Sequence, residues 1–327
     1  MKKFIGRVDN LVQDSAEGLV LAHQDMLMLN TAPLFVHRRQ PKQGRVAVIS
    51  GGGSGHEPLH VGYVGTGMLD AACPGQVFTA PHPDQIVAAA RQVDAGQGVL
   101  LIVKNYPGDR LNFDMASDML SMEHAIVLVD DDVAVDHSTH ATGRRGIAGT
   151  VIVEKMVGAA AEAGADLAEC QRVGQRVNAG TASMGVAFSS CVVPDAATKT
   201  FDIGPGEMEV GVGIHGEPGR YRRSVIPADD IVSLLLDSIL KDLALAPGRE
   251  VLLHVNGFGG TPHIELCFLN KLATLALGQR GLQVKRWLVG NNTTSLEMAG
   301  ASLTVTALDD ELKGLWDAPV RTPTLNW

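Results

Sequence analysis

Three short apolar runs, each followed by a segment with helical character, constrain the fold of this chain more than any other feature. The runs are VAVIS at 46–50, GVLLIVK at 98–104 and HAIVLV at 124–129. Each run is bounded by glycine or a charged turn, which is typical of buried strands. Two segments predict helices, residues 84–93 with Asp84 as a candidate N-cap and residues 149–163. This alternation predicts an α/β domain with a largely parallel sheet.

A change of pattern near residue 180 predicts a second domain. The sequence NAGTA at 178–182 interrupts the helix predicted over 166–177, and another apolar run covers 183–191. The second half then predicts strands at 207–214, 250–255, 283–289 and 302–307 and helices at 228–243 and 264–276. We therefore predict two α/β domains, 1–180 and 181–327, with mostly parallel central sheets. Ligands bind outside the carboxyl ends of such strands, so we expect a substrate site between loops of both domains.

Composition and charge exclude several classes of protein. The 327 residues are 45% hydrophobic, which is enough for two cores, and the net charge is −9. A net negative charge opposes binding to phosphate backbones and anionic lipids, so we expect neither nucleic acid nor membrane as a partner. The N-terminus MKKFIGRVDN lacks the apolar core of a signal peptide, and the sequence has no membrane-spanning apolar run, so we expect a cytoplasmic protein. Its four cysteines match no zinc spacing and predict reduced, mostly buried thiols.

Five loops that follow predicted strands combine glycine with polar or charged residues. They are SGGGSGHEP at 50–58, CPGQVFTAPHPD at 73–84, KNYPGDRLNF at 104–113, DDDVAVDHSTHATGRRG at 130–146 and GVGIHGEPG at 211–219. The glycines of the first loop allow positive φ and leave backbone N–H groups open, as in a phosphate cradle. The loop has neither the GK[ST] of a P-loop nor the GxGxxG of a dinucleotide site, so a simple tight turn is the alternative.

Two histidines occupy matching contexts, His56 in GSGHEP and His215 in GIHGEP. Imidazole can act as a base near neutral pH or as a nucleophile, and a structural role is the alternative for each. Lys104 and Asp109 share another of the loops. They form either a solvated ion pair or a pair that holds the hydroxyls of a polyol, with Asp109 as the base.

The run of three aspartates at 130–132 allows two interpretations. Hard divalent cations prefer several carboxylates, so the run could bind a metal. Adjacent residues of a strand alternate sides, however, which favours capping or contacts with Arg144 and Arg145 instead. We therefore predict no metal site on this chain.

Together the motifs resemble the dihydroxyacetone-binding subunits of dihydroxyacetone kinases over nearly the whole chain. The matching stretches are SGGGSGHEPLHVGYVGTGMLDAACPG, GVLLIVKNYPGDRLNF, VDDDVAV, GRRGIAGTVIVEKMVGAAAE, MEVGVGIHGEPG and LWDAPVRTPTLNW. The resemblance implies that His215 forms a covalent hemiaminal with the ketone carbon of a small keto-sugar such as dihydroxyacetone. It also implies that Gly53, His56, Lys104 and Asp109 bind the hydroxyls, and that Asp109 and His56 assist phosphoryl transfer.

The resemblance further implies that this chain needs a partner. In the family the nucleotide site lies on a separate helical domain or subunit, which carries ADP or ATP with Mg²⁺, so we expect no cofactor here. In the bacterial phosphotransferase version a phosphohistidine protein recharges that partner. The sequence ends at the family's terminal motif, here 324–327, and we expect a catalytically incomplete chain that forms a homodimer.

Departures from the family pattern leave the substrate open. They are Pro107, Ala80, His82, NGFGGT at 256–261 and GNNTTS at 290–295. Ala80 removes a hydroxyl near the expected pocket, so a four-carbon ketose such as erythrulose is an alternative substrate. The rival function is a non-enzymatic ketose sensor or transcriptional coactivator, against which the intact Asp109 and His56 argue because a sensor needs no base. A standalone ATP-dependent sugar kinase is disfavoured, since no nucleotide motif is present.

Overall fold

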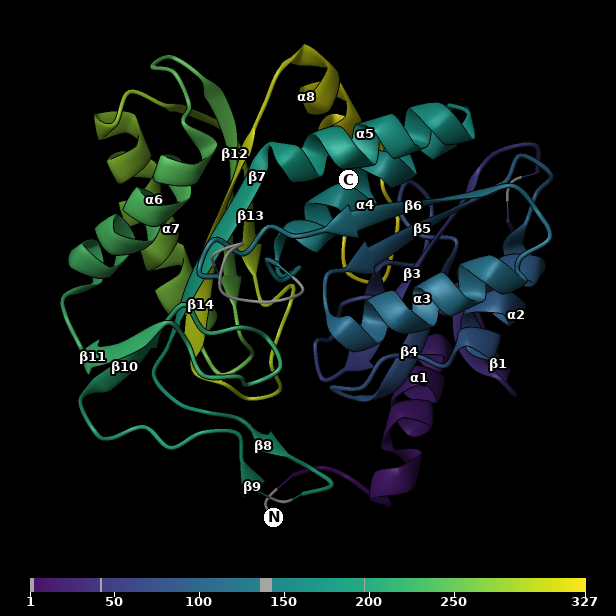
Figure 1. Ribbon diagram of the computed structural model, residues 1–327, viewed down its shortest axis with the longest axis horizontal. Helices are drawn as coiled ribbons and strands as arrows, with labels where there is room; N and C mark the ends of the chain where they lie inside the picture. Colours follow the sequence, from purple (N-terminus) through teal and green to yellow (C-terminus); the bar gives the residue numbers. More distant parts are fainter. Residues whose placement is uncertain (1–2, 42, 136–142, 197) are drawn as a thin grey trace. The chain divides into compact units, whose positions relative to one another are not determined.

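The structure, a computed structural model, describes residues 3–41, 43–135, 143–196 and 198–327 (Figure 1). It forms two compact units, which we call unit 1 and unit 2. Unit 1 contains the residues up to 129, 152–176 and 314–327, and unit 2 contains 130–151 and 177–313. The chain thus passes between the units at four points, one of which, 176/177, lies near the predicted boundary at 180.

The sheet of unit 1 has six strands in the order β1-β2-β4-β3-β5-β6. Their bounds are β1 Leu27–Thr31, β2 Leu34–Arg38, β3 Ala47–Ser54, β4 Ala71–Val77, β5 Val99–Lys104 and β6 His124–Val129. The three predicted strands, now β3, β5 and β6, pair in parallel, and β4 joins β3 in parallel as well. The pairs β1–β2 and β2–β4 are antiparallel, so this sheet is mixed.

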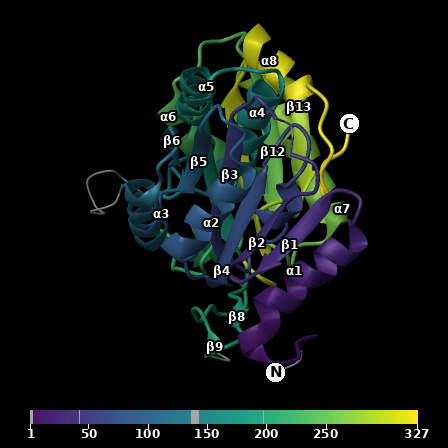
Figure 2. The same ribbon diagram turned by 90° about the vertical axis from the view of Figure 1, so that its right-hand side faces the viewer.

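Helices cover the sheet of unit 1 because its strands carry apolar side chains on both faces. Helices α2 (Pro83–Val93) and α3 (Pro107–Met119) bury residues such as Ile86 and Phe113 against Ile49 and Leu101. Figure 2 shows α1 (Leu11–Ala22) beside β1 and β2. The predicted helix at 84–93 is confirmed, but Asp84 is not its cap. His82 is the N-cap, and its Nδ1 accepts the backbone N–H of Asp84 at 3.4 Å.

Two further helices, α4 (Gly149–Glu162) and α5 (Leu167–Ala179), begin close to where the sequence predicts them. Within unit 1, α5 approaches β6 so closely that a Cβ on Gly174 would lie 2.7 Å from Val127 Cγ2. The glycine therefore sets the helix-to-strand distance. The side chain of Glu154, on α4, is fully buried and reaches the segment that follows β3, where it becomes part of the candidate site.

The sheet of unit 2 has the order β11-β10-β7-β14-β12-β13. Its strands are β7 Thr181–Ala187, β10 Glu207–Val210, β11 Tyr221–Ser224, β12 Glu250–Gly257, β13 Gln283–Gly290 and β14 Gly300–Ala307. Four neighbouring pairs are antiparallel and one, β12–β13, is parallel. The prediction of a mostly parallel sheet is therefore wrong for this unit. Apolar periodicity reports the burial of a strand and carries no information about its direction.

The two faces of this sheet differ in chemistry. Helices α6 (Ala228–Leu243) and α7 (His263–Gln279) lie side by side on one face and bury residues such as Leu236 and Leu277 against Leu253 and Val305 (Figure 1). The other face carries hydroxyl pairs, such as Ser183 with Thr304 at 2.7 Å. Successive side chains of a strand point to opposite faces, which explains this division. Helix α8 (Asp310–Asp317), the short pair β8 (Val192–Val193) and β9 (Thr198–Lys199), and the 3₁₀ helices η1 (Val8–Asn10) and η2 (Val61–Tyr63) complete the elements of the described residues.

Two sequence expectations concern the whole chain. All four cysteines are free thiols, and Cys73, Cys170 and Cys191 are buried, which confirms the prediction of mostly buried cysteines. Over the described ranges, no helix combines the length and the apolar character that a membrane span requires.

Candidate functional site

The glycine-rich segment of unit 1 is strand for most of its length. Gly51, Gly52 and Gly53 continue β3 without positive φ, and the first left-handed residue is Gly55 at φ 97°. Neither interpretation of these first glycines, a cradle with positive φ or a tight turn, holds for residues 51–53. Their function is close approach: a Cβ on Gly52 would overlap the ammonium of Lys104, and one on Gly53 would lie 2.6 Å from the backbone N of Thr79.

His56 lies just beyond this strand and is fully buried. Its ring stacks on Phe78, with centroids 5.2 Å apart and 20° between the planes. Phe78 adopts φ 55°, and its backbone N–H donates to Ser54 O at 2.9 Å. The segment after β4 therefore supports the imidazole from one side, and the missing side chain of Gly53 lets it approach.

Lys104 and Asp109 form a buried ion pair. Lys104 is the last residue of β5, and Asp109 lies in the first turn of α3, which begins with Pro107 at a position where proline is favoured. Lys104 Nζ lies 3.2 Å from Asp109 Oδ2, and the side chains are 0% and 4% exposed. The solvated-pair interpretation is therefore wrong. Burial raises the pKa of Asp109, and the Lys104 charge opposes that rise.

Two residues that were not predicted extend this pair into a network. Lys104 Nζ also lies 2.9 Å from His60 Nε2, and His60 Nδ1 lies 2.6 Å from Glu154 Oε1. We call Asp109, Lys104, His60 and Glu154 the buried network. Burial lowers the pKa of His60 well below its usual value, with the Lys104 charge acting in the same direction, and burial raises the pKa of Glu154 to about 8.

The sequence held a weak signal for these two residues. Glu154 interrupts an apolar helix in TVIVEKMVGAA, where an ionisable side chain is rare unless it has a buried partner. His60 follows His56 by four residues in GHEPLH. Nothing in the sequence indicates that Glu154 reaches a residue 94 positions earlier, so the pair is visible only in the fold.

His215 lies on the loop that follows β10, a strand that ends four residues before the predicted end at 214. The His215 backbone N–H donates to Glu217 Oε2 at 2.8 Å, and Arg145 Nη1 donates to Glu217 Oε1 at 3.1 Å. The first histidine motif has the same local turn, because the Gly55 N–H donates to Glu57 Oε2 at 2.9 Å. In both motifs a glutamate thus accepts the N–H two residues before it, which explains the shared sequence.

The aspartate run has structural partners in unit 2. Asp131 accepts the backbone N–H groups of Ile147 and Gly149, each at 2.7 Å, and so caps the start of α4. Asp132 Oδ2 accepts from Arg145 Nε at 2.7 Å. The predicted capping and arginine contacts are confirmed for these two residues.

The loop at 130–146 that begins with these aspartates is only partly described, since residues 136–142 lie outside the described residues. Within the described part of the chain, no group of three or more His, Cys, Asp or Glu side chains is arranged to hold a metal ion.

The departures from the family pattern lie in two kinds of place. Asn256 Oδ1 accepts the backbone N–H groups of Asn292 and Thr293 at 3.0 and 2.8 Å, so the two unusual late loops are tied to each other. Ala80, in contrast, lies beside the start of α3: a Cβ on Gly108 would sit 3.5 Å from the Ala80 Cβ. Ala80 therefore lies beside Gly108, the residue that precedes Asp109 in α3.

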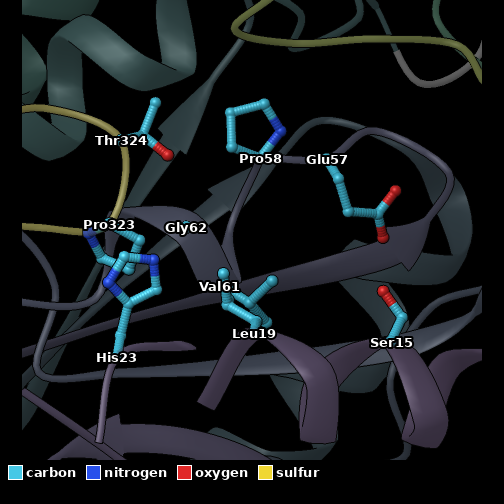
Figure 3. A pocket seen from close by; sticks show the side chains of 9 residues that line it. All are labelled: Ser15, Leu19, His23, Glu57, Pro58, Val61, Gly62, Pro323 and Thr324. Carbon is cyan, nitrogen blue, oxygen red and sulfur yellow. The ribbon is translucent and has the colours of Figure 1, made fainter. Parts of the chain in front are cut away.

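Unit 1 also has a hollow of about 470 Å³ (Figure 3). Its lining comes from α1 (Ser15, Leu19) and its C-cap His23, from Glu57, Pro58, Val61 and Gly62, and from Pro323 and Thr324. Figure 3 shows Glu57 and Ser15 at one end, His23 at the other and Leu19 with Val61 between them. Burial raises the pKa of Glu57. A second cavity of about 10 Å³, lined in part by Gly53 and His60, has room for about one water molecule.

Comparisons with known proteins give one family over the whole chain. The Dak1 domain profile matches residues 17–324. The chain is 44% identical to the PEP-dependent dihydroxyacetone kinase, dihydroxyacetone-binding subunit DhaK, of Escherichia coli K12, covering 100% of this chain and 99% of the relative. It is 47% identical to the dihydroxyacetone-binding subunit of PTS-dependent dihydroxyacetone kinase 1 of Listeria innocua, covering 95% of each. Among solved structures, the dihydroxyacetone kinase operon co-activator Dha-DhaQ matches with a TM-score of 0.89 at 31% identity, covering 95% of this chain and 96% of that one.

Proposed function

Since the chain belongs to the Dak1 domain family, we propose that it is the dihydroxyacetone-binding subunit of a dihydroxyacetone kinase. The observation that supports this most strongly is the buried Lys104–Asp109 pair beside the glycine-rich end of β3. A buried carboxylate with a raised pKa and a fixed cation is costly to maintain, and such arrangements cluster at functional sites.

In this proposal His215 binds the sugar covalently. A ring nitrogen of His215 attacks the ketone carbon and forms an N–C bond, and the C=O π bond breaks. The imidazole N–H proton is transferred to the former carbonyl oxygen, which becomes a hydroxyl. Nothing leaves, so the product is a hemiaminal that carries the whole mass of the ketose. The Glu217–His215 backbone contact supports this role, because it fixes the loop from which the ring projects. Glycerol has no carbonyl carbon and is not bound in this way.

In this proposal residues of unit 1 act on sugar hydroxyls. Gly53, His56 and Lys104 contribute to binding. Asp109, with His56 assisting, accepts the proton of the terminal hydroxyl as that oxygen bonds to the terminal phosphorus of ATP on the partner, whose bond to ADP breaks so that ADP leaves. General-base catalysis requires an ionised acceptor of matched pKa. Asp109 fits, since burial raises its pKa and the adjacent Lys104 charge favours its ionised form. Holding the hydroxyl in line with the phosphorus supplies the remaining part of the rate enhancement.

The phosphoryl donor belongs to a second protein. We propose a helical nucleotide-binding subunit that carries ADP or ATP with Mg²⁺, recharged by a phosphohistidine protein of the phosphotransferase system. The names of the two bacterial relatives, one PEP-dependent and one PTS-dependent, support this source over free ATP.

Reconstitution tests the proposal. The chain is mixed with the helical subunit, with ATP or with a phosphorylated donor protein, and with dihydroxyacetone, glyceraldehyde or erythrulose, and the phosphorylated sugar is measured. We expect product with dihydroxyacetone and the phosphorylated donor protein. Product with erythrulose alone would move the substrate to the four-carbon ketose, and no product with any donor, despite an adduct on His215, would overturn the kinase function.

That last outcome would favour the second candidate, a ketose-binding coactivator. The likeness to the Dha-DhaQ co-activator, at a TM-score of 0.89, is the observation that favours it. A coactivator requires the covalent binding of the ketose by His215 but no general base, and the buried Asp109 therefore argues for the enzyme.

We also propose that the chain is a homodimer through an apolar surface of unit 2. Helix α7 exposes Ile264, Phe268 and Leu275 at 79%, 51% and 56%, and the edge strand β13 exposes Trp287 at 46%. We call these four residues the α7–β13 surface. Exposed large apolar side chains and an edge strand both favour association with another chain, here a second copy.

A further inference from the structure

The ammonium of Lys104 has its hydrogen-bonding capacity filled by protein groups. An ammonium has three donors and no acceptor. Three partners surround Lys104 Nζ: His60 Nε2 at 2.9 Å, Asp109 Oδ2 at 3.2 Å and Gly51 O at 3.3 Å. The side chain is fully buried, so solvent does not replace a lost partner. Its position and charge therefore depend on those three groups, of which His60 is the nearest.

The contacts of His60 determine which of its nitrogens carries the proton. Lys104 donates, so His60 Nε2 must be the unprotonated acceptor and Nδ1 must carry the hydrogen. Nδ1 faces Glu154 Oε1 at 2.6 Å and Ser50 Oγ at 3.0 Å. The Ser50 hydroxyl is a donor to Ile102 O at 2.8 Å, so its oxygen accepts at Nδ1. Glu154 Oε1 accepts there as well, because the ammonium that faces Nε2 has no acceptor for a hydrogen on that nitrogen. Glu154 thus fixes the tautomer that Lys104 requires.

We infer that His60 and Glu154 are positioning residues of the proposed phosphoryl transfer, because they hold the Lys104 ammonium against Asp109. The inference rests on the proposed function. Glu154 holds the proton of His60 on Nδ1. His60 Nε2 then accepts from Lys104 Nζ and sets its position, and the Lys104 charge favours the ionised form of Asp109. These contacts place Lys104 against Asp109 before the sugar hydroxyl that it helps to bind arrives.

The charged groups around the pair agree with this arrangement. His60 faces the charge of Lys104 and, nearby, His56, and both interactions disfavour an imidazolium. Glu154 faces the Lys104 charge and the buried Tyr63, whose own pKa is raised well above its usual value. A neutral His60 is the form that accepts from Lys104, and its environment keeps it in that form.

Two substitutions at one position separate positioning from bulk stability. His60→Leu keeps an apolar side chain but removes both nitrogens, whereas His60→Gln retains an acceptor at about the place of Nε2. Lys155→Met is the matched control, because Lys155 is the next residue of α4, is equally buried and donates to Leu315 O outside the buried network. Each variant is assayed in the reconstituted system for kcat, for KM and for the mass of the dihydroxyacetone adduct.

We expect His60→Leu to lower kcat by roughly 10- to 100-fold with KM and the adduct little changed. His60→Gln should recover part of that loss, and Lys155→Met should stay close to the wild type in kcat. The imidazole ¹⁵N shifts of the wild type should report His60 as the Nδ1–H tautomer.

Glu154→Gln supplies a readout that a role in stability alone would not move. It retains an oxygen acceptor for His60 Nδ1–H but removes the ionisation, so any inflection of kcat near pH 8 in the wild type should disappear. Wild-type kcat in His60→Leu, equal losses in His60→Leu and Lys155→Met, or an Nε2–H tautomer would each overturn the inference. Absence of turnover in the wild type would instead count against the proposed function, so the two failures are distinguishable.

Discussion

Replacing Lys104 by methionine tests whether the Lys104–Asp109 pair is truly desolvated. Methionine fills a similar volume and removes the charge, which leaves Asp109, 4% exposed, without its counter-ion. Breaking a buried ion pair in this way costs about 3–5 kcal/mol of unfolding free energy, against at most about 1 kcal/mol for an exposed pair. The loss of the His60 and Gly51 contacts adds to this cost. We therefore expect a destabilisation of at least about 3–5 kcal/mol near neutral pH.

The destabilisation should depend on pH in a defined direction. In the wild type the Lys104 charge limits the rise in the pKa of Asp109, and the variant loses that limit, so the pKa rises further. A folded-state pKa raised above the unfolded value near 3.9 means that the folded state binds more protons, and stability falls as pH rises through that window. The difference between variant and wild type should therefore grow from pH 4 to pH 8.

Thermal melts followed by circular dichroism at several pH values measure this, at roughly 2–4 °C per kcal/mol. The double variant Lys104→Met/Asp109→Leu is the control, because it removes the orphaned carboxylate and should recover much of the stability. A loss below about 1 kcal/mol that is the same at pH 5 and pH 8 would show that the pair is solvated and would refute the reasoning.

Three further predictions concern the sugar, the loop and the assembly. Asp109→Ala should keep the dihydroxyacetone adduct and lower turnover by roughly 100-fold or more in the reconstituted assay; normal turnover would remove Asp109 as the base. Glu217→Gln leaves one oxygen for the two donors that now bind the carboxylate, the His215 backbone N–H and Arg145 Nη1. Calorimetry should therefore show roughly tenfold weaker dihydroxyacetone binding, and unchanged affinity would mean that this contact does not position His215. Phe268→Asp should give a monomer in analytical ultracentrifugation, whereas a dimer of unchanged stability would place the interface elsewhere.

Much of the local structure could be predicted from the sequence because it depends on local signals. The strand at 124–129 and the helix at 228–243 have the predicted bounds, since turn residues and apolar periodicity mark both ends. The direction of the strands in unit 2 could not be predicted. The register of β14 on β7, with Leu303 opposite Met184, joins residues over a hundred positions apart, and both strands would look the same in a parallel sheet.

The candidate site shows the same division. The motifs correctly indicated Lys104 and Asp109 as a pair, but the sequence suggested a loop where Asp109 lies in the first turn of a helix. His60 and Glu154 were missed because a buried polar pair is defined by its partner, and the partner is brought close only by the packing of α4 in unit 1. The glycines at 51–53 predict a phosphate cradle or a tight turn, because the sequence does not show that Lys104 occupies the space beside Gly52.

The mass of the intact chain in the presence of dihydroxyacetone tests the central claim most directly. Native mass spectrometry of the wild type should show one added ketose per chain, with no added mass in glycerol, which has no carbonyl. His215→Ala should show no adduct, while Lys155→Met, outside the binding residues, should show the wild-type adduct. An adduct of unchanged occupancy on His215→Ala would contradict the account, because the covalent grip would then belong to another residue.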